Sequence, residues 1–309
     1  MIFTTETLQE IFPLLKEKLQ NNTHTTFQVL NPDVAPGSYA GTKIAVEGRT
    51  CLYRSLRAWM ELAELLGCRM HVPKAEGEQL ITLTFEKIAQ DSFHKSVAEK
   101  REEKYGTDSL FAKIHKMEEP AFFYYYLQAL DNVNIAERKR ILNLGINRGD
   151  EFEVIRNKID INKYQSMELI GIDHSKSAIA YAESLFPEEN ATFYTHDINR
   201  LKDLELGKFD LLISIGTLQS PGIHFKPFLM DLVQNCLQED AALILGFPNS
   251  RWTGGEMVYG AKAPNYAMSE MSLLFNDVMF AKKYLQQKKY RVMITGKQYL
   301  FLTAVKIGQ

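Results

Sequence analysis

The sequence predicts an α/β protein whose larger part is a doubly wound, mostly parallel seven-stranded sheet with an antiparallel C-terminal strand, preceded by a smaller N-terminal α+β domain. From about residue 140 onward, short apolar β-rich runs alternate with helical segments, as in βαβ units with right-handed crossovers. The chain ends in two strand-like runs joined near Gly296, which indicates a hairpin. Its 309 residues suffice for two domains, and we expect them at 1–118 and 119–309.

The N-terminal part contains fewer clear signals. "MIFTTETLQEIFPLLKEKL" lacks a basic start and a cleavage site, so it is interpreted as an amphipathic helix rather than an export signal. "GTKIAVEGRTCLY" and "LITLTFEKI" are typical of strands, and "SLRAWMELAELLG" has helical spacing with Gly67 as its C-terminal cap. The charged run "HKSVAEKREEKYG" predicts an exposed helix or linker, and "EEPAFFYYYLQAL" an aromatic helix before the large sheet.

Composition excludes several classes of protein. The formal net charge is −2, 45% of residues are hydrophobic, and no apolar run reaches the roughly 18 residues of a membrane span. We therefore expect a cytoplasmic protein without a membrane partner. The three cysteines form no CxxC pair, which favours reduced core thiols over a disulfide framework or a zinc site. No metal is expected.

The stretch "RILNLGINRGDEF" predicts a strand, a glycine turn and a helix. Gly145 and Gly149 would let the backbone turn sharply and approach a ligand at the helix N-terminus. Asn147 can make the turn because Asn tolerates positive φ. Asn143 stands where an acid often precedes such a loop. Alone, the pattern also fits a tight βα turn.

Two further predicted strands end in acids. "ELIGIDHS" ends at Asp173, whose carboxylate could accept both hydroxyls of a ribose lying across the edge of the sheet. The alternative is that Asp173 only caps the helix beginning near Ser175. "THDINRL" offers Asp197 to an adenine amino group. Because the loop has two glycines instead of GxGxxG, a dinucleotide cofactor is disfavoured.

In this order of residues, the part from about 120 to 309 resembles the class I S-adenosylmethionine-dependent methyltransferases. The resemblance implies S-adenosyl-L-methionine as cofactor, with the glycine loop at its methionine part, Asp173 at the ribose and Asp197 at the adenine. "KFDLLISIGTLQSP" matches the family's fourth strand. The cofactor-binding residues expected from the resemblance are Gly145, Asn147, Gly149, Asp173, His174, Asp197, Ile198, Ser214, Ile215 and Gly216.

The acceptor of the methyl group is less defined. "IGTL" stands where an "NPPY"-type tetrapeptide for planar amino groups would lie, and no cysteine is there, so a small organic acceptor is favoured. His224 and His196 are candidate general bases, since His accepts protons near neutral pH. "FPNSRWTGGEMVYGAKAPNY" combines flat apolar side chains with a cation, as an acceptor pocket would. Its candidates for substrate binding are Arg251, Trp252, Met257, Tyr259 and Tyr266.

RNA is the main rival acceptor. A third hypothesis is that the protein is a non-catalytic donor-binding module. "GSYAGTKIAVEGRTCLYRSLRAW" interleaves aromatic and basic residues that could form a base-stacking face. Acidic side chains slightly outnumber basic ones in residues 1–138, whereas RNA binding favours a basic surface. The residues of that face would be Tyr39, Lys43, Arg49, Tyr53, Arg54, Arg57 and Trp59. A homo-oligomer is possible.

Overall fold

The computed structural model describes residues 1–89, 103, 105–260 and 271–308. The chain forms two compact units. The first unit contains Met1–Ser92 together with Trp252–Val258, and the second contains Phe93–Arg251 together with Tyr259–Gln309. The division at residue 92 differs from the boundary at 118 that we expected, because residues from Glu103 onward are hydrogen bonded to the second unit's own loops and helices.

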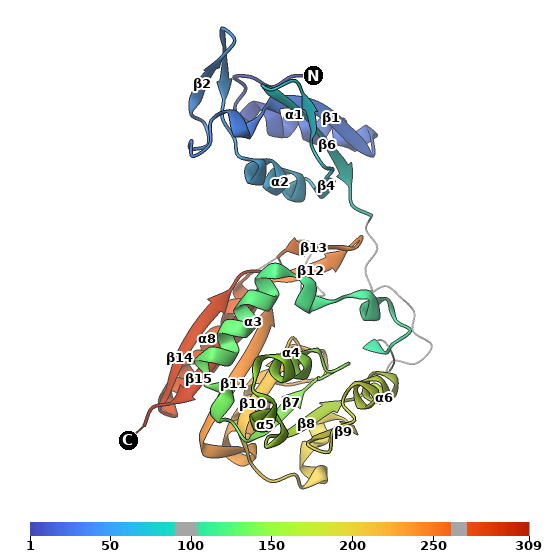
Figure 1. The fold of residues 1–309 in the computed structure, drawn as a ribbon, viewed down its shortest axis with the longest axis vertical. Coiled ribbons are helices and arrows are strands. Elements are labelled where there is room, and N and C mark those ends of the chain that lie inside the picture. The colour runs from blue at the N-terminus through green and yellow to red at the C-terminus, as the bar shows by residue number, and fades with distance from the viewer. Residues whose placement is uncertain (90–102, 104, 261–270, 309) are drawn as a thin grey trace. The chain divides into compact units, whose positions relative to one another are not determined.

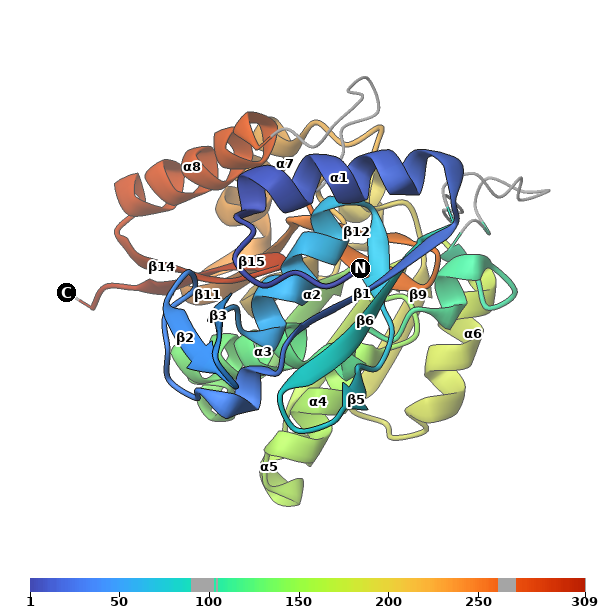
Figure 2. The same ribbon diagram turned by 90° about the horizontal axis from the view of Figure 1, so that it is seen from above.

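The first unit is an α+β fold built on antiparallel strands (Figure 2). Strand β6 pairs with β1 along its length and with β4 and β5 on its other side, and β2 and β3 form a separate hairpin. Its elements are α1 (Leu8–Asn21), β1 (His24–Leu30), η1 (Pro32–Val34), β2 (Lys43–Val46), β3 (Arg49–Leu52), α2 (Leu56–Leu65), β4 (Cys68–Met70), β5 (Lys74–Glu76) and β6 (Leu80–Lys87).

Alternation along β1 and β6 creates one buried face. Phe27 on β1 and Leu83 on β6 are paired and buried, whereas their neighbour Thr26 is exposed and Thr84 is half-buried. The apolar stripes of α1 and α2 pack on the buried face, where Trp59 is 2% exposed. The result is a two-layer unit with its own core.

The second unit contains the predicted seven-stranded sheet, with the strand order β14-β15-β11-β10-β7-β8-β9. Neighbours from β11 through β9 are parallel, and β15 is antiparallel to both of its neighbours. This confirms the predicted fold class. The strands are β7 (Arg140–Leu144), β8 (Glu168–Asp173), β9 (Ala191–Thr195), β10 (Phe209–Ile215), β11 (Leu237–Pro248), β14 (Tyr290–Gly296) and β15 (Tyr299–Lys306).

Helices cover both faces of this sheet, so β7 and β10 are almost wholly buried, as expected of central parallel strands (Figure 1). One core joins the sheet to α3, α4, α5 and α6, and a second joins the opposite face to η7, α7 and α8. These helices are α3 (Pro120–Asn132), α4 (Asp150–Lys158), α5 (Ile161–Gln165), α6 (Lys176–Leu185), η7 (Ile198–Leu204), α7 (Phe225–Asp231) and α8 (Ser272–Gln287). The shorter helical turns are η4 (Leu110–Lys113), η5 (Lys116–Glu118), η6 (Ile135–Glu137) and η8 (Leu232–Cys236).

The C-terminal strand β15 is antiparallel, as predicted, and lies between β11 and β14, so the outermost strand is parallel to β11. Two other details differ from expectation. The segment after β11 forms a hairpin, β12 (Ser250–Thr253) and β13 (Glu256–Tyr259), rather than a loop. Strands β1, β4 and β5 lacked a sequence signal strong enough to predict them. Most of the charged run 94–106 lies outside the described residues.

Within the described ranges, no helix is both long and apolar enough to cross a membrane. All three cysteines are free, with Cys51 and Cys68 buried and Cys236 half-buried. Burial raises the pKa of each of these thiols. They therefore resemble structural thiols rather than activated nucleophiles.

Candidate functional site

The glycine loop between β7 and α4 adopts the conformation that its residues permit. Gly145, Asn147 and Gly149 all have positive φ, at +78°, +48° and +94°. A Cβ on Gly145 would fall 1.9 Å from Oγ1 of Thr217, which follows β10. Glycine at 145 is therefore required both for its φ and for the close approach of the two strand ends. Asn147 makes the turn, as predicted from its tolerance of positive φ.

Asp173, at the end of β8, ties the loop to the next helix. Asp173 is buried, with 6% of the residue exposed. Oδ2 accepts a hydrogen bond from the backbone N-H of Asn147 (3.0 Å), and Oδ1 accepts one from the N-H of Ser175 (3.0 Å). A carboxylate offers about four acceptor positions, so two remain, which is the number needed for two ribose hydroxyls.

The alternative role considered for Asp173, as cap of α6, belongs to another residue. Ser175 is the N-cap, and its Oγ accepts from the N-H of Ala178 (3.2 Å). Asp173 lies two residues earlier, at the end of β8. Its place at the carboxyl edge thus cannot be explained by helix capping.

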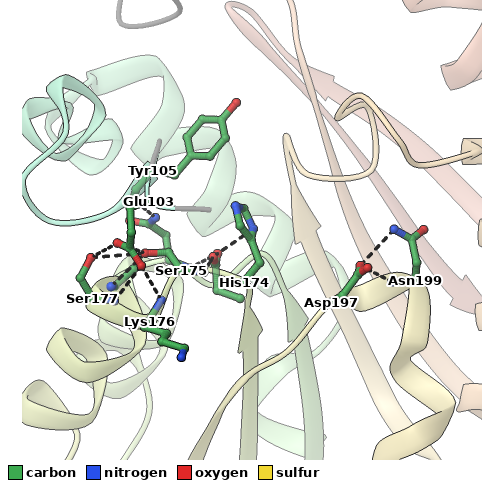
Figure 3. Close-up of polar contacts among 11 residues, drawn as sticks. Glu103, Tyr105, His174, Ser175, Lys176, Ser177, Asp197 and Asn199 are labelled. Atoms are coloured by element: carbon green, nitrogen blue, oxygen red, sulfur yellow. Dashed lines mark hydrogen bonds and ion pairs between the residues drawn. The ribbon is translucent and has the colours of Figure 1, made fainter. Parts of the chain in front are cut away.

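The predicted acid that follows β9 is more exposed to solvent than Asp173. Asp197 is exposed and caps η7, with Oδ1 accepting from the N-H (2.9 Å) and from Nδ2 (3.0 Å) of Asn199 (Figure 3). Its Oδ2 has no hydrogen-bond partner among residues that the structure describes. Ile198 instead packs in the core below. His174 is half-exposed beside Asp173, with Nδ1 3.5 Å from Oδ1.

The three cofactor-binding residues predicted at the end of β10 are Ser214, Ile215 and Gly216, and the first two have structural roles. Ser214 is buried and donates its hydroxyl to the carbonyl oxygen of Leu144 (3.0 Å), which fixes β10 against β7. Ile215 is buried in the core. Gly216 has φ +73°, and the hydroxyl of Tyr299 lies 3.4 Å from where its Cβ would be. Tyr299, which the sequence did not single out, therefore contributes a phenol at this strand end.

A segment that precedes α3 was also missed by the sequence analysis. The Glu103 carboxylate accepts hydrogen bonds from the Lys176 N-H (3.0 Å) and from the hydroxyls of Ser175 (3.1 Å) and Ser177, all at the start of α6 (Figure 3). The Tyr105 carbonyl oxygen accepts from Nδ2 of Asn147 (2.9 Å). The side chain at 147 thus holds this segment over the glycine loop.

Arg148 extends the same attachment, donating to the carbonyl oxygens of Ala112 (2.6 Å) and Ile114 (3.2 Å). The Tyr105 ring meets His174 edge to face at 6.1 Å. Burial, the nearby carboxylate of Asp173 and the phenol of Tyr299 all raise the pKa of Tyr105. Residues 105–114 therefore lie at the carboxyl edge, close to the group expected to hold the ribose.

Four of the residues predicted to bind the substrate, Arg251, Trp252, Met257 and Tyr259, lie on the β12–β13 hairpin. Arg251 donates to the carbonyl oxygen of Gly260 (2.9 Å), and the Tyr259 hydroxyl contacts the Met271 sulfur at 3.7 Å. Trp252 and Met257 belong to the first compact unit. Tyr266 lies outside the described residues.

The two candidate bases differ in availability. His196 Nε2 is 2.9 Å from the carbonyl oxygen of Arg200, so that nitrogen is already engaged. His224 is exposed just before α7. In the portion of the chain that is described, no three His, Cys, Asp or Glu side chains are grouped as metal ligands would be.

Of the seven residues of the predicted RNA-binding face, Tyr39, Lys43, Arg49 and Arg57 are exposed and three are not. Tyr53, Arg54 and Trp59 are buried, at 6%, 7% and 2% exposure. Arg54 donates to the carbonyl oxygen of Glu6 and lies over the Trp59 ring. Side chains fixed inside the first unit cannot stack on bases.

The chemistry of the edge fits an adenosyl cofactor with an amino-acid part. Asp173 has acceptor capacity for a diol, and the glycine loop presents backbone without side chains. Asn143 is 1% exposed, and its Nδ2 is buried without a hydrogen-bond partner among the described residues, two positions before the loop. Such an orphaned donor calls for an explanation in a native structure, and a polar ligand group at the loop provides one.

Comparisons with protein-family models and with curated sequences give no match. Among solved structures, the chain is similar to a precorrin-6y C5,15-methyltransferase from Geobacter metallireducens GS-15 (12% identity, TM-score 0.41, 60% of this chain and 88% of that one). It is also similar to a plantazolicin methyltransferase in complex with a pentazolic desmethylPZN analog and SAH (14% identity, TM-score 0.43, 67% of this chain and 95% of that one). A third similar structure is magnesium protoporphyrin IX methyltransferase from Synechocystis PCC 6803 with bound SAH (17% identity, TM-score 0.39, 63% of this chain and 88% of that one).

The order and direction of the strands decide the fold class. β10, β7, β8 and β9 run parallel with their carboxyl ends at one edge, and β15 is antiparallel beside β11. The fold is a doubly wound, Rossmann-like α/β fold with one antiparallel strand, as the sequence predicted. In α/β sheets of this kind, ligands bind outside the carboxyl ends of the strands, where Asp173 and the glycine loop meet.

Proposed function

We propose that this protein binds S-adenosyl-L-methionine at the carboxyl edge of its large sheet and transfers the methyl group to a small organic acceptor. The supporting observation is the placement of Asp173. Its buried carboxylate joins the glycine loop to the start of α6 and keeps two acceptor positions for a ribose. Among the described residues, the other group beside this carboxylate is the half-exposed His174, with Nδ1 3.5 Å from Oδ1.

The bound donor would supply a methyl group already activated by a sulfonium. The chain therefore needs mainly to bind, orient and exclude water. The loop with Gly145 would let the ligand approach the backbone, and Asp173 would fix the ribose. Residues 105–114 would limit water over the site, since they are held to the loop and to α6 by hydrogen bonds.

A general base is needed only if the acceptor carries a proton that must leave. His224 is the better of the two candidates, because His196 Nε2 is already paired with a carbonyl oxygen. If His224 accepts this proton, replacing it by Gln should lower the rate without changing donor affinity.

Calorimetric titration with S-adenosyl-L-methionine and with S-adenosylhomocysteine tests donor binding directly. We expect both to bind. Absence of heat with either ligand would refute the proposal and leave the fold as a scaffold. Binding of both without turnover on any fraction of a cell extract would favour the non-catalytic module.

Methyl-labelled donor incubated with cell extract tests the acceptor class. We expect label in the small-molecule fraction. Label in RNA, together with retention on bulk tRNA that weakens steeply with salt, would replace the small acceptor by RNA. The burial of Tyr53, Arg54 and Trp59 supports the small acceptor, because it removes three of the residues that RNA recognition would have used.

A further inference from the structure

Beside the glycine loop the second unit contains a buried ion pair. Lys116, in η5, and Glu151, in the first turn of α4, lie with Nζ 3.6 Å from Oε1. Their side chains are 15% and 4% exposed. Most other ion pairs of the described chain have at least one partner that is much more exposed.

Aromatic side chains enclose the pair. Nζ of Lys116 lies 5.6 Å from the centre of the Phe122 ring, and that ring meets Tyr299 edge to face at 5.0 Å. The Tyr126 hydroxyl donates to the backbone oxygen of Glu151 (3.1 Å). Since the Tyr299 hydroxyl lies over Gly216, the pair is close to the ends of both β7 and β10.

The ammonium has bonding capacity to spare. A lysine carries three N-H donors, and the carboxylate of Glu151 is its one ion-pair partner among the residues described. Burying two charges costs more than their attraction returns unless further hydrogen bonds satisfy them. A pair of this kind is therefore explained best by a ligand that completes it.

Glu151 is two residues past Gly149, at the loop expected to face the methionine part of the donor. That part is an α-amino acid, so it carries one ammonium and one carboxylate a few ångströms apart. An ion pair of opposite polarity is complementary to such a zwitterion, and neither charge would then remain unmatched.

We propose that Lys116 binds the α-carboxylate and Glu151 the α-ammonium of the donor's amino-acid part. The inference rests on the proposed donor binding and deepens it by naming the two residues that distinguish the complete donor from its nucleoside. Arg148, the nearest alternative cation on the loop, already donates to two backbone carbonyl oxygens and contacts Asp150 at 3.9 Å.

Burial raises the pKa of the Glu151 carboxyl, and the Lys116 ammonium opposes that rise. Burial lowers the pKa of Lys116, but Glu151, Tyr299 and Asp150 together outweigh it, so the pKa lies above the ordinary value for lysine. The ammonium is therefore present throughout the neutral range. It can bind a carboxylate without any change in protonation.

The test compares S-adenosylhomocysteine with 5′-methylthioadenosine, which lacks the amino-acid part, by calorimetry on the full chain. Lys116→Met should weaken binding of S-adenosylhomocysteine about 10- to 100-fold, the effect of losing one charged hydrogen bond, and leave methylthioadenosine unchanged. It should have no further effect on a decarboxylated analogue. Glu151→Gln should behave in the same way with an analogue that lacks the amino group.

Removing one partner of a buried pair can destabilise the fold, so the double variant Lys116→Met/Glu151→Met accompanies the single ones. Replacing both charges by apolar side chains of similar volume is often tolerated. Lys163→Met, which removes an exposed lysine paired with Glu137 at 3.2 Å, is the matched control and should change neither affinity.

Equal loss of both ligands in a folded variant would overturn the inference, because the pair would then only support the loop. Equal affinity of the unmodified protein for both ligands would also overturn it. Failure of the unmodified protein to bind either ligand would refute the proposed function itself. Selective loss of S-adenosylhomocysteine is the one outcome that supports the inference.

Discussion

Asp173→Ala is the most direct perturbation of the candidate site. The substitution removes the acceptor of two ribose hydroxyls, and a hydrogen bond to a charged group contributes about 1.5 to 3 kcal/mol. The expected loss of donor affinity is about 3 kcal/mol or more, which is at least about 100-fold. The same change leaves the N-H groups of Asn147 and Ser175 without their acceptor, at about 1 to 3 kcal/mol each in unfolding free energy.

The chain offers a matched control at the opposite edge of the sheet. Asp210 is 8% exposed and accepts from the backbone N-H groups of Lys139 (2.7 Å) and Arg140 (2.9 Å). Asp210→Ala should therefore lower stability by a similar amount and leave the affinity for S-adenosylhomocysteine unchanged. Urea unfolding and calorimetry measure the two quantities separately. Donor affinities within a few-fold of each other in the two variants would refute the role assigned to Asp173.

Three further outcomes are expected. Gly145→Ala should abolish donor binding in calorimetry, since the new Cβ meets Thr217 and the φ of +78° is unfavourable for alanine; retained affinity would contradict this. The Ser177 hydroxyl and other donors hold the pKa of Glu103 below its ordinary 4.5, so the part of the anchoring that Glu103 provides should be complete above that pH and lost as pH falls through the depressed pKa, while the hydrogen bonds from Asn147 and Arg148 remain. Limited proteolysis against pH should show this loss, and Glu103→Gln should make cleavage less dependent on pH. Under native conditions the three thiols should react slowly with iodoacetamide, because burial raises the pKa of each, and rapid alkylation would contradict that.

Local patterns in the sequence were sufficient to predict the large sheet. Each strand and helix of a βα unit can be predicted from its own residues, because buried parallel strands are continuous apolar runs and the helices between them show a 3.6-residue period. The positive φ of Asn147 followed in the same way from the chemistry of one side chain. The polar ends of β7 and β8 could be predicted to meet, because parallel neighbours place their carboxyl ends together.

Contacts between distant residues were not predictable in this way. Glu103 is 73 positions from Lys176, and nothing local distinguishes it from other acids of its charged run. Ser214 looked like a cofactor contact, yet its hydroxyl is directed at a backbone oxygen 70 positions away. Tyr53 and Trp59 are amphipathic side chains, and only the packing of α1 and α2 decided that they are buried.

The seven residues Trp252–Val258 give the first unit an unusual boundary. The Gly254 carbonyl oxygen accepts from Arg69, and Glu256 is 3.8 Å from the same guanidinium. That unit is thus assembled from two separate stretches of the chain, on either side of five strands of the large sheet. A fragment ending at residue 92 would lack part of its own surface. During synthesis its last piece emerges only after those strands have been translated, so completion of the N-terminal unit must wait for most of the C-terminal one.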